Sequence, residues 1–229
     1  MKKISIVIPA LNEKDGIGNT IRAIPKEELQ RMGYEVQVLA VDNGSTDGTS
    51  ELARKAGAEV VFEPKSGYGS AYKAGFAHAK GEIIATGDAD GTYPMQDIPE
   101  LVRILEQSNL GFVTTNRFPL MAKGAMSLQH KVGNTILSLA VRLLFQIDMK
   151  DPESGMWLFR RHILDKLRLG SDTWPFSHEL KLEACYFNKC RWREVPIRYR
   201  GRAGNSKLLS SWKVGFADLF HIMKKRIVR

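Results

Sequence analysis

Short apolar, β-branched runs alternate along the first half of the chain with segments whose apolar positions recur at helical spacing. Runs of the first kind are typical of buried strands, and the second kind is typical of amphipathic helices. Strands that alternate with helices form mostly parallel sheets, so the pattern predicts an α/β fold. The predicted strands are residues 4–8, 36–41, 58–62, 83–86 and 111–115, and the predicted helices are residues 13–24, 46–56, 69–79 and 97–107.

The alternation is less regular in the second half. Residues 119–128 have no clear period and predict a loop, whereas residues 132–145 predict a strongly apolar helix. We predict two units: an α/β domain over 1–207 and an amphipathic helix within 208–229. The remaining predicted elements are strands at 155–160 and 193–199 and a helix at 179–187. One face of the last helix carries Trp212, Phe216, Leu219, Phe220 and Met223, while Lys213, Lys224 and Arg226 lie off it.

The net charge of +9 over 229 residues is concentrated in the tail. Residues 189–229 hold 12 Lys or Arg and 2 Asp or Glu, a net charge of +10. The first 188 residues hold 22 basic and 23 acidic residues, a net charge of −1. This asymmetry indicates a polyanionic partner, namely nucleic acid, an anionic membrane or a phosphate group.

Two carboxylates, Asp88 and Asp90, follow the strand predicted at 83–86 and lie one residue apart. Ligands of open α/β sheets bind at the carboxyl ends of the strands. An Asp-x-Asp pair there can chelate Mg²⁺ or Mn²⁺ through oxygen and leave positions for phosphate oxygens. The pair therefore suits a nucleotide diphosphate, with a solvated acidic turn as the alternative.

Several other classes of site are excluded because their residues are missing. An EF-hand loop starting at Asp88 requires Gly at position 93 and Glu at position 99, where the chain has Tyr93 and Pro99. The turn after the first strand contains no glycine, and no Walker A pattern occurs, which argues against NAD, FAD and P-loop nucleotide sites.

Cys185 and Cys190 are expected to be reduced thiols. Neither a signal peptide nor an apolar run of 18 residues is found.

Motifs in a fixed order carry a family resemblance over about residues 4–208. The chain reads Val-Ile-Pro-Ala-Leu-Asn-Glu at 7–13, Val-Asp-Asn-Gly-Ser-Thr-Asp-Gly-Thr at 41–49 and Asp-Ala-Asp at 88–90. It continues with Asn-Arg-Phe at 116–118, Asp-Pro-Glu-Ser-Gly-Met at 151–156, Glu-Val-Pro-Ile at 194–197 and Arg-Ala-Gly-Asn-Ser-Lys-Leu at 202–208. The series resembles family-2 glycosyltransferases of the GT-A fold, and the second half resembles their dolichyl-phosphate mannose synthase branch. Thr92 stands where better-known mannose synthases carry a glutamine that touches the metal.

The resemblance implies a GT-A fold, with helices flanking a mostly parallel central sheet and an amphipathic helix at the carboxyl end. It implies an inverting, metal-dependent enzyme that uses Mg²⁺ or Mn²⁺. The expected reaction moves a hexose from a GDP-mannose- or UDP-glucose-type donor to a dolichyl or undecaprenyl phosphate. The alternative is a glycosyltransferase that acts on a soluble glycan or a small phosphorylated acceptor.

Roles for individual residues follow from the strand ends and the resemblance together. Asp42 suits ribose or base donors, although Ser45 or Thr46 capping the next helix is the structural alternative. A lipid phosphate is already an anion near neutral pH, so no essential histidine base is expected. Donor binding is assigned to Pro9, Leu11, Glu13, Asp42, Gly67 and Asp88, and metal binding to Asp88 and Asp90. Acceptor phosphate binding is assigned to Arg117, Lys131, Arg202, Ser206 and Lys207, and catalysis to Asp90, Arg117 and Arg202.

The tail suggests where the enzyme works. An aromatic face flanked by Lys and Arg is typical of an interfacial helix on an anionic membrane surface. The alternative is that the aromatic residues pack on the catalytic domain. The expected location is cytoplasmic, peripheral on the cytoplasmic face of the membrane, with a membrane protein as a further partner and no nucleic acid partner.

Overall fold

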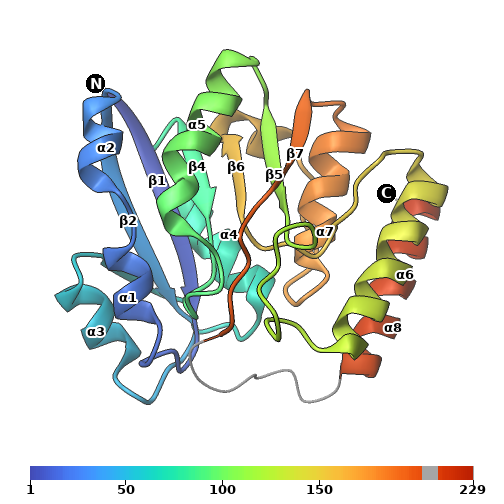
Figure 1. Ribbon diagram of the computed structural model, residues 1–229, viewed down its shortest axis with the longest axis horizontal. Helices are drawn as coiled ribbons and strands as arrows, with labels where there is room; N and C mark the ends of the chain where they lie inside the picture. The colour runs from blue at the N-terminus through green and yellow to red at the C-terminus, as the bar shows by residue number, and fades with distance from the viewer. Residues whose placement is uncertain (203–210, 229) are drawn as a thin grey trace.

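One mixed sheet runs through the molecule (Figure 1). The structure, a computed structural model, describes residues 1–202 and 211–228, and the side chains of these except 211–213. Its strand order is β3-β2-β1-β4-β6-β5-β7, and among the described strands only β6 runs antiparallel to its neighbours. The strands are β1 (Lys2–Ala10), β2 (Tyr34–Asp42), β3 (Glu59–Phe62), β4 (Ile83–Thr86), β5 (Phe112–Asn116), β6 (Trp157–Arg160) and β7 (Trp192–Pro196).

Helices cover both faces of the sheet, in keeping with the predicted α/β fold. The helices whose buried residues join one face are α1 (Ile17–Arg22), α2 (Lys26–Arg31), α3 (Thr49–Lys55) and α5 (Ile98–Gln107), which follows the short 3-10 helix η1 (Met95–Asp97). The other face carries α4 (Tyr68–His78), α6 (Leu128–Phe145), α7 (Phe176–Lys181), its π-helical continuation η3 (Leu182–Phe187) and α8 (Ser211–Ile227), with the 3-10 helix η2 (Arg161–Lys166) beside them.

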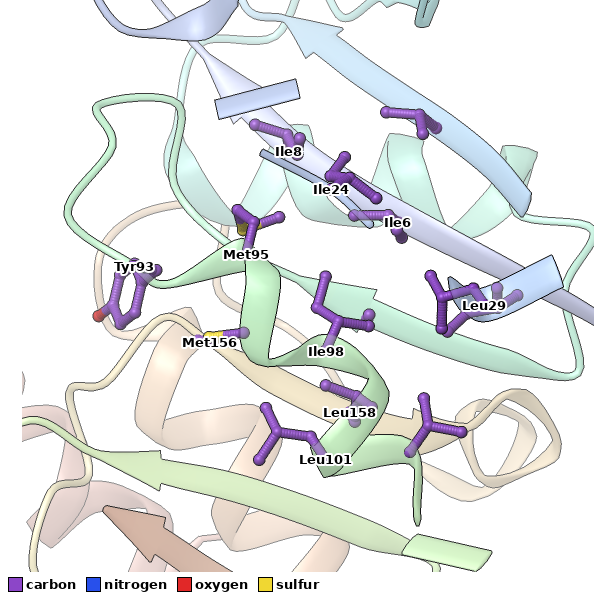
Figure 2. Packing of buried hydrophobic residues seen from close by; sticks show 14 of the residues in the cluster. Ile6, Ile8, Ile24, Leu29, Tyr93, Met95, Ile98, Leu101, Met156 and Leu158 are labelled. Carbon is purple, nitrogen blue, oxygen red and sulfur yellow. The ribbon is translucent and has the colours of Figure 1, made fainter. Parts of the chain in front are cut away.

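The two faces follow from alternation along the strands. In β1, Ile4, Ile6 and Ile8 pack on the first helical layer, whereas Val7 packs on the second, and all four are fully buried. Figure 2 shows the first layer, where Ile6 and Ile8 lie among side chains from α2, α5 and β6. Successive strand side chains point to opposite faces, so a parallel strand buried on both sides must be apolar at nearly every position.

Most predicted elements are present, with boundaries that differ by a few residues, and three of the differences have a local explanation. The first helix begins at Ile17 because residues 13–16 form a turn in which the Glu13 carbonyl accepts from the N–H groups of Gly16 and Ile17. Helix α2 was not predicted, since Leu29 is its only buried residue and shows no period. Helix α6 begins at Leu128, four residues before its predicted start, where the Ser127 hydroxyl accepts from the N–H of His130 at 3.2 Å.

The last helix lies beside α6 at one edge of the molecule (Figure 1). Its inward side is formed by Asp218, Ile222 and Lys225, which are all buried. Phe216 and Phe220 are each 68% exposed, so the alternative that the aromatic residues pack on the catalytic domain is wrong for these two rings. The side chain of Trp212 lies outside the described residues. No helix in the described part of the chain combines the length and hydropathy that crossing a bilayer requires.

Candidate active site

A pocket of about 860 Å³ opens where β1, β4 and β5 end. This is the edge at which open α/β sheets bind their ligands. Helices α6 and α8 line another part of the pocket with the apolar residues Ile136, Leu137, Phe216 and Leu219. Polar residues of the same helices, among them Gln129, Asn134 and Asp218, also line it. The pocket thus has a polar end at the sheet and a partly apolar end between two helices. The residues assigned from sequence that line it are Pro9, Leu11, Glu13, Gly67, Asp88, Asp90, Arg117 and Arg202.

Asp90 is buried and Asp88 is half-buried at the polar end, beyond β4. The hydroxyl of Tyr68 donates to Asp88 Oδ1 at 3.2 Å. Asp90 Oδ1 accepts from the backbone N–H and the hydroxyl of Thr92, at 3.1 and 2.7 Å. Burial, followed by the charge of Asp90, raises the pKa of Asp88 to about 7. Thr92 therefore positions one carboxylate of the pair.

The pair fits the chemistry of a hard divalent cation. Mg²⁺ and Mn²⁺ prefer oxygen ligands, and both residues supply carboxylate oxygens on one short turn. Among the described residues, Asp88 has no hydrogen-bond partner other than Tyr68, which leaves oxygen lone pairs for coordination. Desolvation first, and then the like charge of Asp90, raise the pKa of Asp88, and a bound cation would relieve the cost of keeping this carboxylate charged.

Arg202 reaches this site from the other end of the chain. Its guanidinium forms ion pairs with Glu13, through Nη2, and with Asp90 Oδ2, through Nη1 at 3.2 Å. A residue 189 positions from Glu13 is thereby brought to the carboxylate pair. Arg202 thus stands beside the proposed metal ligand, where its charge can also face a phosphate group.

Arg117 is almost entirely enclosed and has a carboxylate partner. Its Nε and Nη2 donate to the Asp151 carboxylate at 2.8 and 2.7 Å, and its backbone N–H donates to the same carboxylate at 3.0 Å. The guanidinium also lies over the ring of Tyr199. Among the described residues Nη1 has no hydrogen-bond partner, and Arg117 lines the pocket. The Asp151 pair therefore fixes the direction in which the one remaining amino group can act.

Two other assigned residues, Asp42 and Lys131, do not line the pocket. The Asp42 carboxylate accepts from the N–H of Ser45 at 2.8 Å and from the hydroxyl of Ser50, so it stabilises its own turn. Lys131 lies on α6. Ser206 and Lys207 lie outside the described residues. The roles assigned to these residues remain predictions.

The turn after β2 and the glycine before α4 carry sequence features that the structure explains by local packing rather than by ligand binding. Neither Ser45 nor Thr46 caps α3, whose first turn is instead held by Asp47, which accepts from the N–H and the hydroxyl of Thr49. Gly67 has a φ of 138°, and a Cβ there would collide with the backbone oxygen of Asp172. Its close backbone approach is therefore to another part of the chain, although it also lines the pocket.

Sequence reasoning missed two parts of the site. Tyr68 and Trp174 stack with ring centroids 4.8 Å apart, and both line the pocket. A cluster of Glu153, His178 and Asp218 also lies at the pocket, and two of its members line it. These residues are separated by tens of positions along the chain, so no spacing pattern could have joined them.

Fold and site together define a class of protein. A mostly parallel sheet covered on both faces, with an Asp-x-Asp pair in a pocket at its carboxyl edge, is the arrangement of a glycosyltransferase with the GT-A fold. The family model described as glycosyl transferase family 2 matches residues 5–168. The chain belongs to this family.

Curated relatives support the family assignment. The chain is 32% identical over 209 residues to the low-salt glycan biosynthesis hexosyltransferase Agl6 of Haloferax volcanii, covering 90% of this chain but 50% of that protein. It is 30% identical over 207 residues to the dolichyl-phosphate hexose transferase of the same organism, covering 90% and 86%. An undecaprenyl-phosphate 4-deoxy-4-formamido-L-arabinose transferase of Salmonella paratyphi B is 29% identical, covering 90% and 63%. The chain thus spans about half the length of the first of these relatives.

Solved structures agree on the fold. Glucosyl-3-phosphoglycerate synthase from Mycobacterium tuberculosis, in complex with Mn²⁺, UDP-glucose and phosphoglyceric acid, superposes with a TM-score of 0.78 at 22% identity. The match covers 98% of this chain and 79% of that one. At this identity the similarity establishes the GT-A architecture.

Proposed function

We propose that this protein transfers a hexose from a nucleotide-diphosphate sugar to a polyprenyl phosphate at a membrane surface, with inversion and with Mg²⁺ or Mn²⁺. The observation that carries the proposal is one continuous pocket that joins the Asp88–Asp90 pair to apolar residues of α6 and α8. A nucleotide diphosphate suits the first part, and a prenyl chain suits the second. The dolichyl-phosphate hexose transferase among the relatives supports the same acceptor class.

The chain's own residues divide the work along this pocket. Asp88 and Asp90 would hold the cation, which when bound neutralises the charge that develops on the leaving diphosphate. Pro9, Leu11 and Glu13, at the end of β1, would position the base and ribose of the donor. The acceptor phosphate would lie between Arg117 and Arg202. The phosphate is already an anion, so the transfer needs no histidine as a general base.

A direct test separates this acceptor from its rival. Purified protein with Mn²⁺ is screened by thermal shift against GDP-mannose, UDP-glucose and UDP-N-acetylglucosamine, since a ligand that binds only the native state raises its stability. The donor identified is then supplied with a polyprenyl phosphate, and separately with a soluble glycan or phosphoglycerate. Transfer to the lipid phosphate supports the proposal. Transfer only to a soluble acceptor contradicts it and favours the alternative.

Replacing Arg202 with alanine tests the acceptor assignment. The change removes one charge-assisted contact to the phosphate, worth about 1.5–3 kcal/mol, so kcat/KM for the acceptor should fall about 10- to 100-fold. Donor affinity, measured by calorimetry, should not change. Arg191→Ala is the matched control, because Arg191 is exposed and does not line the pocket. A fall in donor affinity instead would move Arg202 to the donor side, which its contacts with Glu13 and Asp90 also permit.

The proposed membrane contact is a surface that two helices share, which we call the α6–α8 face. The two helices pack together, and the Nε of Arg226 donates to the carbonyl of Leu144 at 2.9 Å. Exposed Lys224 and Arg226 lie on α8 beside the apolar residues and match an anionic surface. We propose that the α6–α8 face rests on the cytoplasmic leaflet. Its exposed apolar residues are Leu128, Val132, Ile136, Leu139 and Leu143 on α6 and Phe216, Phe220, Met223 and Ile227 on α8.

The double substitution Phe216→Ser/Phe220→Ser should abolish most binding to anionic vesicles. Burying one aromatic ring contributes about 1.5–3 kcal/mol, so vesicle affinity should fall at least tenfold. Phe62→Ser is the control, since Phe62 is 65% exposed but lies on β3, at the opposite edge of the sheet. Co-sedimentation of the unmodified protein should keep a salt-resistant part at 1 M salt, where the Debye length is about 3 Å.

Two outcomes would contradict the membrane assignment. In the first, the double variant sediments with vesicles as the unmodified protein does, which would mean that the two rings make no contact with lipid. In the second, the unmodified protein stays in the supernatant and is dimeric by gel filtration, while the double variant is monomeric. The α6–α8 face would then be a dimer interface.

A further inference from the structure

A second group of ionisable side chains lies at the pocket, apart from the Asp88–Asp90 pair. Glu153 precedes β6, His178 belongs to α7, and Asp218 belongs to α8. One ligand atom from each lies within 4.8 Å of the other two. His178 is fully buried and Asp218 is 4% exposed. Three separate elements therefore bring two carboxylates and an imidazole to one buried point.

The carboxylate of Asp218 is incompletely satisfied there. Its Oδ1 is buried and has no hydrogen-bond partner among the described residues. The buried lysines of α7 and α8 have other partners: Lys181 donates to three backbone carbonyls, and Lys225 pairs with Glu179 and Glu183 at 3.0 Å each. A buried polar oxygen without a partner is costly, so the described part of this site lacks a positive or donating group for Asp218.

Contacts at both ring nitrogens hold His178 in a fixed orientation. Its Nδ1 lies 2.8 Å from Glu153 Oε1, and its Nε2 lies 2.9 Å from His221 Nδ1. His221 Nε2 in turn lies 3.9 Å from a carboxylate oxygen of Glu179. If Nδ1 of His178 ligates an ion, its Nε2–H can donate to His221 and the Nε2–H of His221 can point to Glu179. Metal-binding histidines are usually held in this way by a hydrogen bond at the other nitrogen.

We propose that Glu153, His178 and Asp218 bind a divalent transition-metal ion of the Zn²⁺ class, at a site separate from the Asp88–Asp90 cation. An imidazole nitrogen with two carboxylate oxygens is a donor set that such ions accept. The ion would replace the proton that His178 and Glu153 share. Ligand atoms around a four-coordinate zinc ion lie about 3.4 Å apart, so the side chains would have to move closer than their present spacing, which is up to 4.8 Å, on binding.

Two consequences follow from the position of the site. Three protein ligands would leave a fourth coordination position open, and because Glu153 and Asp218 line the pocket, a group bound in the pocket could occupy it. The ligands also come from α7 and α8, so a bound ion would tie the carboxyl-terminal helix to the catalytic domain. Binding should therefore raise thermal stability.

The test uses the full chain with Asp88→Asn/Asp90→Asn, which removes the other carboxylate pair and makes the result independent of transferase activity. After treatment with a chelator, this protein is titrated with Zn²⁺ by calorimetry and by thermal unfolding. We expect one bound ion and a raised unfolding temperature. Adding Asp218→Asn or His178→Asn should weaken Zn²⁺ binding on the order of 100-fold, and His221→Asn about 10-fold or more.

The controls separate this site from adventitious zinc binding. His162→Asn changes an exposed histidine outside the cluster and should leave the affinity unchanged. If His178→Asn does not fold, as judged by circular dichroism, the Asp218→Asn variant still decides the question. The proposal is overturned if the Asp88→Asn/Asp90→Asn protein binds no zinc, or if the same protein with Asp218→Asn added binds zinc equally tightly.

Discussion

Replacement of Asp90 by asparagine is expected to lower the transferase rate on the order of 100-fold while the protein stays folded. The reason is electrostatic: the loss of one carboxylate from the Asp88–Asp90 pair removes about 3 kcal/mol of charge stabilisation from the transition state. An asparagine oxygen can still accept the two hydrogen bonds from Thr92, so the turn beyond β4 keeps its shape. Affinity for Mn²⁺, measured by calorimetry, should fall together with the rate.

The control for this change is Asp15→Asn, since Asp15 is exposed and does not line the pocket. Its rate should equal that of the unmodified protein. Excess EDTA should reduce the unmodified protein to the level of the Asp90 variant. The proposed metal site would be wrong if the Asp90 variant kept activity within about threefold, or if EDTA had no effect.

Removal of Asp151 should have the largest effect on folding. The carboxylate is fully buried and accepts three hydrogen bonds from Arg117. Asp151→Ala leaves the guanidinium buried without its counter-charge, which typically costs roughly 3–5 kcal/mol in the free energy of unfolding. Denaturant titration measures this loss directly. Asp148→Ala is the control, because Asp148 is 66% exposed in a surface pair with Arg142 and should change stability by less than about 0.5 kcal/mol.

The Arg117–Asp151 pair also predicts how the folding stability depends on pH. Burial alone would raise the pKa of Asp151, but the Arg117 guanidinium holds that pKa below its ordinary value. The folded pKa is therefore lower than the unfolded pKa of roughly 3.9, so the stabilisation is complete above the unfolded value and is lost as pH falls through the folded one. The stability gap between the unmodified protein and Asp151→Asn should be constant from about pH 6 to 8 and shrink below about pH 4. A gap that stays the same at low pH would contradict the ion pair.

The sequence determined which segments form the sheet and where its ligand edge lies. Apolar runs such as 4–8 and 83–86 can be buried only as strands, because each is too short for a helix and apolar on both faces. A carboxylate pair placed directly after one run must then lie at the strand end, and the structure has Asp88 and Asp90 in a pocket there. These features depend on neighbours within a few residues, so they can be read along the chain.

Partners distant in sequence were decided only by the tertiary structure. Arg117 could not be assigned to Asp151 from sequence, nor Arg202 to Glu13, because these contacts join residues 34 and 189 positions apart. The antiparallel direction of β6 has the same cause, since nothing within the strand itself encodes the direction of its neighbours.

The orientation of α8 was decided in the same way. Its pattern offers two opposite faces, one with Asp218, Ile222 and Lys225 and one with Phe216 and Phe220. Hydrophobicity alone would bury the rings, yet the buried face is the first, because Lys225 meets the carboxylates of α7 and η3 and Ile222 joins the core. Sequence fixes the faces of a helix through local spacing, and only the groups that it meets across the fold determine which face is buried.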